Sequence, residues 1–130
     1  MLSTILSSAT IVMLPLFGTL PNVWQCNNEF NWAYYKETST VYICYTSDEK
    51  QVEFVKYHEL GHHFWYKYMN QSQRDEYTKL WKESKWFYRD YGKTSALEDF
   101  ADSFSLVATK KNTYRVKDKM NLIRKYIWEL

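Results

Sequence analysis

The chain has 130 residues, of which 45% are hydrophobic and 19% aromatic, and it carries a formal net charge of +2. This length suits one domain with a single core, and the hydrophobic content excludes a disordered chain. A net charge this close to zero gives no bias toward nucleic acid, so we expect no nucleic-acid partner. We also expect a monomer.

The N-terminal segment is apolar, and Glu29 is the first charged residue. Residues 1–20, MLSTILSSATIVMLPLFGTL, are typical of a signal-peptide core or a membrane anchor, although no Lys or Arg lies near Met1 and Pro15 weakens a membrane span. We therefore expect residues 1–25 to be a signal peptide or membrane anchor, so that the protein is secreted or membrane-attached. Residues 26–130 would form a single domain. A buried N-terminal helix, or a cytoplasmic protein, is the alternative.

A β-hairpin is predicted next, with strands at residues 31–35 and 40–44 and a turn at 36–39. Aromatic and β-branched residues dominate both strands. Cys26 and Cys44 flank this hairpin. In an exported protein a disulfide between them would pin the hairpin, and two buried thiols are the alternative.

Four helices follow, so the predicted fold is α+β and mostly helical. The first helix begins with a capping box at residues 46–49. Its phase places His63 on the solvent side with Lys56 and Lys67. The predicted buried stripe consists of Val52, Val55, His58, Glu59, His62, Trp65 and Met69.

The other three helices are separated by clear breaks. The second begins after Ser72, and residues 85–94 form a loop with Gly92 as the breaker. Ser95 caps the third helix. The fourth lies within residues 114–130, and we expect its basic residues on a solvated face.

The first helix carries the pattern HExxH. His58 and His62 are four residues apart, so both imidazoles share one face, about 6 Å apart along the axis, and can reach one metal ion. Glu59 lies beside that face and can act on a water bound to the ion. The pattern is typical of zinc with an activated water and a carboxylate base. Two core histidines with Glu59 at the surface are the alternative.

Gly61 lies inside the same predicted helix. Glycine inside a helix costs about 1 kcal/mol relative to alanine. The cost is tolerable if another backbone must pass close to the site.

A catalytic zinc site needs a third protein ligand. The metzincin pattern would require Gly and His where this chain has Trp65 and Tyr68, so the ligand must be a carboxylate. The best source is EDFAD, in which Glu98 and Asp102 again lie four residues apart on one helical face. Asp99 is the less favoured ligand. Ser95 and Glu98 also fit a capping box, which would compete for the Glu98 side chain.

These motifs resemble those of a known family. HELGH followed 36 residues later by EDFAD, with a tyrosine seven residues before the glutamate, is similar to the gluzincin branch of zinc peptidases, especially its small lethal-factor-like members. The resemblance covers about 45 residues, from His58 to Phe104. It implies a zincin-like fold, with the hairpin packed on the HExxH helix.

The resemblance also implies roles for four side chains. Glu98 would bind zinc, Asp102 would orient His58, and Tyr91 would stabilise the oxyanion. Asp102 is shorter than the glutamate also found at its position in the family, so it must approach its partner more closely. For Tyr91, an ordinary core or loop aromatic is the alternative reading.

The expected function is therefore zinc-dependent hydrolysis of a peptide or protein substrate, with Glu59 as general base. The strand at residues 40–44 would offer its edge to an extended peptide. Two alternatives remain open. One is a cytosolic HExxH peptidase of the type that cleaves phage-type repressors, and the other is a non-catalytic metal-binding module derived from a peptidase.

Overall fold

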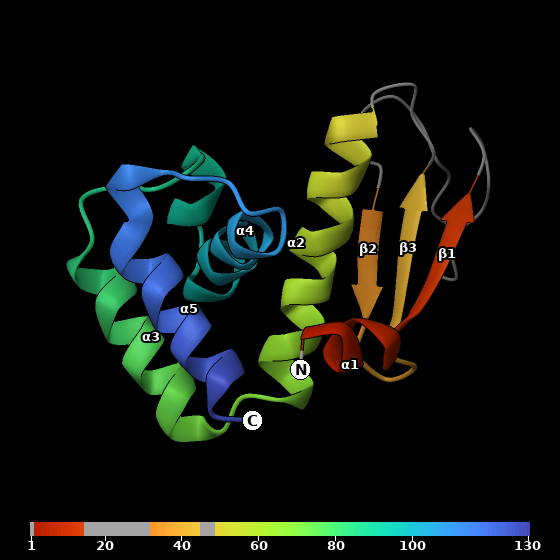
Figure 1. Cartoon of the computed structure of the whole chain (residues 1–130), viewed down its shortest axis with the longest axis horizontal. Helices are drawn as coiled ribbons and strands as arrows, with labels where there is room; N and C mark the ends of the chain where they lie inside the picture. The colour runs from red at the N-terminus through yellow and green to blue at the C-terminus, as the bar shows by residue number, and fades with distance from the viewer. Residues whose placement is uncertain (1, 15–31, 45–48) are drawn as a thin grey trace.

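A computed structural model describes residues 2–14, 32–44 and 49–130. Helix α2 lies in the middle, with a small sheet on one side and the remaining long helices on the other (Figure 1). The fold is α+β and mostly helical, as predicted. The elements are α1 (Leu2–Ser7), β1 (Thr10–Leu14), β2 (Trp32–Tyr35), β3 (Thr40–Cys44), α2 (Glu49–Lys67), α3 (Gln71–Glu83), η1 (Asp90–Lys93), α4 (Ala96–Ala108), η2 (Tyr114–Val116) and α5 (Lys117–Trp128).

The sheet has the strand order β1-β3-β2. The predicted hairpin is confirmed, because β2 pairs antiparallel with β3 and Tyr35 lies opposite Thr40. Ser39 has a positive φ of 48° in the connecting turn. β1 was not predicted as a strand, and it pairs parallel to β3 from Thr10↔Thr40 to Leu14↔Cys44. The expectation that residues 40–44 offer a free edge is therefore wrong, because β3 is paired on both sides.

The N-terminal segment packs against the rest of the chain. Ile5 of α1 is buried in the main core, and β1 extends the sheet. The described residues include no helix with the length and hydropathy needed to cross a bilayer. Residues 15–25 lie outside the described ranges, so processing or anchoring through residues 1–25 stays a prediction.

The predicted disulfide involves one described cysteine. Cys44 ends β3, is buried and is disulfide-bonded. Cys26, its partner in the prediction, lies outside the described residues.

The helix boundaries follow local capping chemistry. α3 begins earlier than predicted, because Asn70 rather than Ser72 caps it: the Asn70 side chain accepts from Gln73 N, and the Gln73 side chain accepts from Asn70 N. Ser95 caps α4 as predicted, since its hydroxyl accepts from Glu98 N at 3.1 Å. The capping box expected at residues 46–49 falls on positions of which only Glu49 is described, as the first residue of α2.

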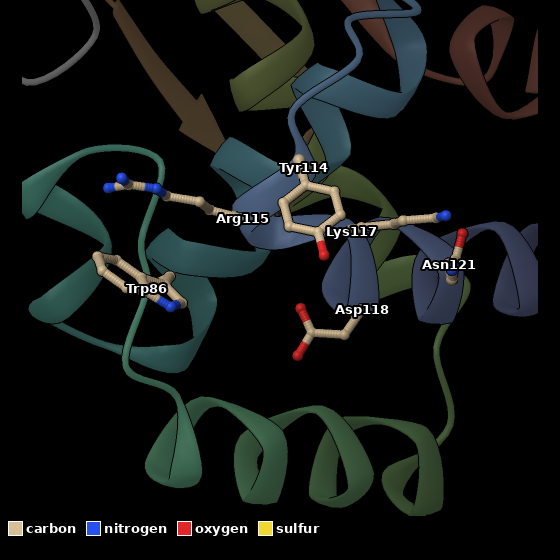
Figure 2. Close-up of a pocket in the computed structure, with 6 residues that line it drawn as sticks. All are labelled: Trp86, Tyr114, Arg115, Lys117, Asp118 and Asn121. Carbon is tan, nitrogen blue, oxygen red and sulfur yellow. The ribbon is translucent and has the colours of Figure 1, made fainter.

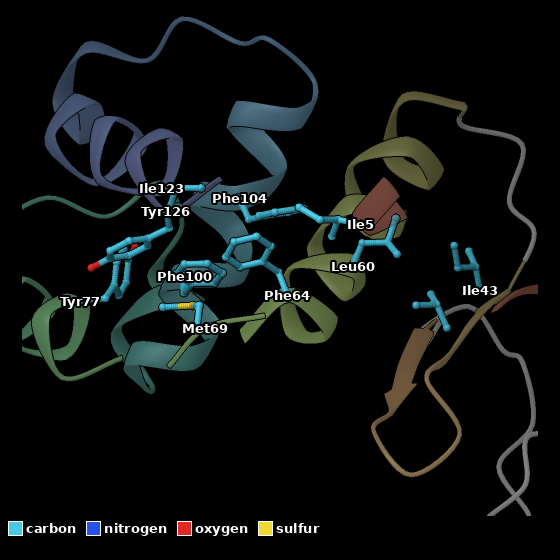
Figure 3. Close-up of a cluster of buried hydrophobic side chains, with 11 residues drawn as sticks. Ile5, Ile43, Leu60, Phe64, Met69, Tyr77, Phe100, Phe104, Ile123 and Tyr126 are labelled. Carbon is cyan, nitrogen blue, oxygen red and sulfur yellow. The ribbon is translucent and has the colours of Figure 1, made fainter. Parts of the chain in front are cut away.

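The main core runs through the whole molecule, from the sheet across α2 to α4, α3 and α5 (Figure 3). Phe64 of α2 packs on Phe100 and Phe104 of α4, with ring centroids 5.9 and 5.5 Å apart. The predicted stripe is confirmed only in part, because Val52, His62 and Trp65 are partly buried. Since α2 is covered on two sides, residues outside the stripe are buried as well. The buried residues of α2 are Val55, His58, Glu59, Leu60, Gly61, His63 and Phe64.

Candidate metal centre

Helix α2 brings His58 and His62 to the face that meets α4. A Cβ placed on Gly61 would lie 2.9 Å from the Ala101 Cα and 3.1 Å from the Phe104 Cβ. Real side chains do not approach a backbone that closely, so the two helices touch here because residue 61 is glycine. This confirms the expected close approach, and it places the first turn of α4 beside the two imidazoles.

Glu98 lies in that first turn and faces both histidines. Its Oε2 is 3.0 Å from His58 Nε2, and its Oε1 is 3.0 Å from His62 Nε2. The capping role of residue 98 is fulfilled by its backbone N–H, which donates to Ser95 Oγ. The two roles expected for Glu98 therefore coexist, since the helix end uses the amide and leaves the carboxylate for the imidazoles.

The charges of these groups depend on one another. Burial alone would lower the pKa of His58, but hydrogen bonds to Asp102 and Glu98 outweigh it and raise this pKa to about 9. Burial would raise the pKa of Glu98, but the hydrogen bond with His58 and the close imidazole of His62 hold it well below its usual range. In the metal-free chain a proton on His58 thus supplies the positive charge that Glu98 needs.

The donor set fits a divalent metal ion. Single ligand atoms from His58, His62 and Glu98 lie within 4.8 Å of one another. His62 Nε2 is a buried polar atom without a hydrogen bond in the described structure, although it lies 3.0 Å from Glu98 Oε1. Two imidazole nitrogens and a carboxylate suit zinc, and also other divalent ions of similar softness. These residues could hold such an ion, which would also give His62 Nε2 a partner.

Glu59 lies beside this set as a second buried carboxylate. Its Oε1 is 3.9 Å from His58 Nε2, and its Oε2 is 3.4 Å from His62 Nδ1. Oε2 is buried and has no hydrogen-bond partner among the described residues. Burial raises the pKa of Glu59, and this effect outweighs the neighbouring imidazoles of His62 and His58, which lower the pKa. Glu59 is therefore poised to accept a proton next to the metal ligands, and the alternative that placed it at the surface is wrong.

Asp102 occupies the position that the family resemblance implied. Its Oδ1 accepts from His58 Nδ1 at 2.7 Å, and the residue is almost fully buried. This bond leaves Nε2 as the nitrogen of His58 that faces Glu98. Asp102 also receives two bonds from Arg89, a residue that sequence reasoning did not identify.

Tyr91 lies at the edge of the centre, in η1. Its ring centroid is 6.1 Å from that of His58, and 48% of the residue is exposed. Burial of the hydroxyl, and then the charge of Glu98, raise the pKa of Tyr91 to about 12. Tyr91 is therefore a protonated donor at neutral pH with access to solvent.

Asp99, the less favoured ligand, points elsewhere. It is fully buried, it pairs with Lys119 Nζ at 3.0 Å, and it accepts from Tyr77 Oη at 2.9 Å. Lys119 itself is only 1% exposed, so the expectation that the basic residues of α5 lie on a solvated face is wrong for this residue. Asp99 is bound within a buried polar cluster.

The expectation that His63 faces solvent is also wrong. His63 is buried, with Nε2 at 2.7 Å from Ser8 Oγ and Nδ1 at 2.7 Å from Tyr34 Oη. Burial, and then the charge of Lys67, lower its pKa. The N-terminal segment and β2 cover the side of α2 that was assigned to solvent.

A separate cavity lies away from the metal ligands (Figure 2). Its volume is about 590 Å³, and the Arg115 guanidinium lies 4.4 Å from the Trp86 ring centroid at its rim. Both cations and a carboxylate line it, so the lining favours no single class of ligand. The lining residues are Trp86, Tyr114, Arg115, Lys117, Asp118 and Asn121.

The candidate metal centre thus consists of two imidazoles from α2 and one carboxylate from α4, with Glu59 and Asp102 beside them. Comparison of the chain with protein-family models, with curated proteins and with solved structures finds no match.

Proposed function

We propose that this protein is a zinc-dependent peptidase with a zincin-like fold, in which His58, His62 and Glu98 hold the ion. The supporting observation is the convergence of three ligand atoms from two helices within 4.8 Å, next to the buried carboxylate of Glu59. A structural zinc site has four protein ligands, whereas three ligands and a nearby carboxylate are typical of a catalytic site that binds water.

A divalent ion held there would activate a water molecule and polarise the scissile carbonyl. Glu59 accepts the proton of the attacking water at its unpaired Oε2 and delivers it to the leaving amine. Burial raises the pKa of Glu59, which brings the carboxylate closer to the basicity that this transfer requires. Tyr91 donates its hydroxyl proton in a hydrogen bond to the developing oxyanion.

The substrate is an extended peptide that lies along β2. This strand pairs only with β3 among the described residues, so its other side is available for strand addition. Tyr34 of β2 also approaches the centre, with its ring centroid 6.5 Å from that of His62. β2 therefore replaces the 40–44 strand as the proposed substrate strand.

Export from the cytoplasm is the proposed setting. The disulfide at Cys44 supports it, because disulfides persist in oxidising compartments. Mass spectrometry of the exported protein, with and without reductant, tests this setting together with processing near residue 25.

Metal analysis and peptide hydrolysis test the function itself. We expect one zinc ion per chain, lost in His58→Ala and retained in Glu59→Gln, while hydrolysis of a mixed peptide library is abolished in both variants. Full hydrolytic activity in Glu59→Gln would falsify the general-base role. A chain that binds zinc but cleaves no peptide would instead be the non-catalytic metal-binding module.

A further inference from the structure

Arg89 contacts the metal centre through one intermediate residue. Its Nε donates to Asp102 Oδ2 at 3.0 Å, and its Nη2 donates to Asp102 Oδ1 at 2.6 Å. Asp102 Oδ1 also receives the bond from His58 Nδ1. A two-pronged contact between guanidinium and carboxylate fixes the plane of the carboxylate as well as its position. The orientation of the His58 ring therefore depends on a carboxylate that Arg89 immobilises.

Arg89 is itself held in place by two aromatic rings. Its guanidinium carbon lies 5.0 Å from the Phe54 ring centroid and 5.6 Å from that of Tyr91. Phe54 lies on α2, one helical turn before His58. Arg89 thus joins α2, α4 and the segment that carries Tyr91, with little freedom to leave Asp102.

The 84–95 segment does not depend on Arg89 alone for its attachment. Trp81 Nε1 donates to Gly92 O at 2.9 Å, and Lys119 Nζ donates to Trp86 O at 2.7 Å. These bonds anchor the segment on both sides of residue 89. The segment therefore has attachments besides the bonds between Arg89 and Asp102, and these bonds can serve mainly to fix the Asp102 carboxylate.

We propose that Arg89 is a positioning residue that sets the metal affinity of this centre: it locks Asp102, and Asp102 aims His58 Nε2 at the ion. This inference rests on the proposed metal site and not on the proposed hydrolysis. Partners of metal-binding histidines typically change metal affinity by about 10- to 100-fold when they are removed. Arg89 lies one residue further out, so we expect the lower end of that range.

Zinc affinity of the full chain, measured by competition with a chromophoric chelator, tests the proposal. We expect Arg89→Met to weaken zinc binding by about 10-fold. Arg89→Lys keeps the charge but loses the two-pronged contact, so it should weaken binding several-fold. Arg74→Met is the matched control, because Arg74 also donates to α2, at the carbonyls of Trp65 and Tyr66, and these bonds involve neither Asp102 nor a proposed ligand. Its zinc affinity should equal that of the wild type.

A double-mutant cycle with Asp102→Asn identifies the route of the effect. If Arg89 acts through Asp102, Arg89→Met adds little to the loss of zinc affinity already caused by Asp102→Asn. An equal loss in both backgrounds overturns the proposal, and so does wild-type zinc affinity in Arg89→Lys. Zinc affinity is measured without substrate. A wild-type chain that binds zinc but cleaves no peptide would therefore refute the proposed peptidase activity, and the test of Arg89 would still stand.

Discussion

Two neighbouring carboxylates of α4 have opposite surroundings. Asp99 meets the buried ammonium of Lys119 at 3.0 Å and the hydroxyl of Tyr77 at 2.9 Å. Glu98, the preceding residue, meets the imidazoles of His58 and His62 at 3.0 Å, and the buried His62 Nε2 lacks a hydrogen bond. One carboxylate is neutralised by a permanent charge of the chain, whereas the other relies on groups that carry charge only when protonated.

We interpret Asp99 as a structural carboxylate and Glu98 as the candidate metal ligand. A buried carboxylate needs a counter-charge, because leaving it unpaired costs several kcal/mol. Asp99 has that charge within the fold. Glu98 obtains it from the protonated imidazole of His58 or from a metal ion, and the ion would also give the buried His62 Nε2 a partner. The following changes test this division.

The largest effect is expected at the Asp99 cluster. Lys119→Met leaves Asp99 buried without its counter-charge, so the free energy of unfolding should fall by about 3–5 kcal/mol. Denaturation in urea measures the loss. Lys117→Met, an exposed lysine of the same helix, should stay within about 0.5 kcal/mol of the wild type. A similar loss in both variants would contradict a special role for the buried pair.

Zinc binding should distinguish the two acids directly. Glu98→Gln removes a ligand, so zinc affinity should fall by more than the roughly 100-fold seen when outer partners are removed. Asp99→Asn should destabilise the fold but leave zinc affinity within a few-fold of the wild type. Isothermal titration of both variants makes the comparison. A larger loss of zinc affinity in Asp99→Asn than in Glu98→Gln would indicate that Asp99 is the ligand.

The close contact of α2 with α4 predicts a smaller effect. Gly61→Ala inserts a methyl group 2.9 Å from the Ala101 backbone, and overpacking of this kind typically costs about 1–3 kcal/mol. The better helix propensity of alanine returns up to about 1 kcal/mol. A net loss of about 1–2 kcal/mol in unfolding free energy should accompany weaker zinc binding. An increase in the unfolding free energy of Gly61→Ala would show that α2 and α4 can move apart without an energetic cost.

The most gradual effect is the pH dependence. In the metal-free chain the pKa of His58 is raised from 6.5 to about 9, so its stabilising contribution is complete below pH 6.5 and is lost as the pH rises through 9. Zinc requires neutral imidazoles, so the stabilisation by zinc should grow over the same interval. Thermal unfolding with chelator and with zinc should show these opposite trends. If the contribution of His58 and the stabilisation by zinc changed with pH in the same direction, zinc would not be replacing the proton on His58.

The sequence predicted the parts of the centre that follow local spacing. His58 and His62 share a face because they are four residues apart, and the cap at Ser95 places Glu98 in the first turn of its helix. The hairpin was predicted from residue type alone. These features depend on the period of one element or on a known motif, so one stretch of sequence contains them.

The features that were missed depend on distant contacts. Residues 10–14 begin with three β-branched residues, but this apolar stretch was interpreted as part of a signal peptide or anchor, and the partner strand lies 30 residues later. His63 was placed in solvent because a phase argument assumes one buried face, whereas α2 has two. Lys119 was predicted on a solvated face and Arg89 was not singled out, because only the tertiary structure reveals the carboxylates that they pair with.

The parallel pairing of β1 with β3 has a consequence during synthesis. Residues 2–14 leave the ribosome before their partners in β3 and α2, which follow at about 5–20 residues per second. Until those partners emerge, the segment is an apolar stretch without the strand that pairs with it. Translation speed therefore sets how long β1 stays unpaired.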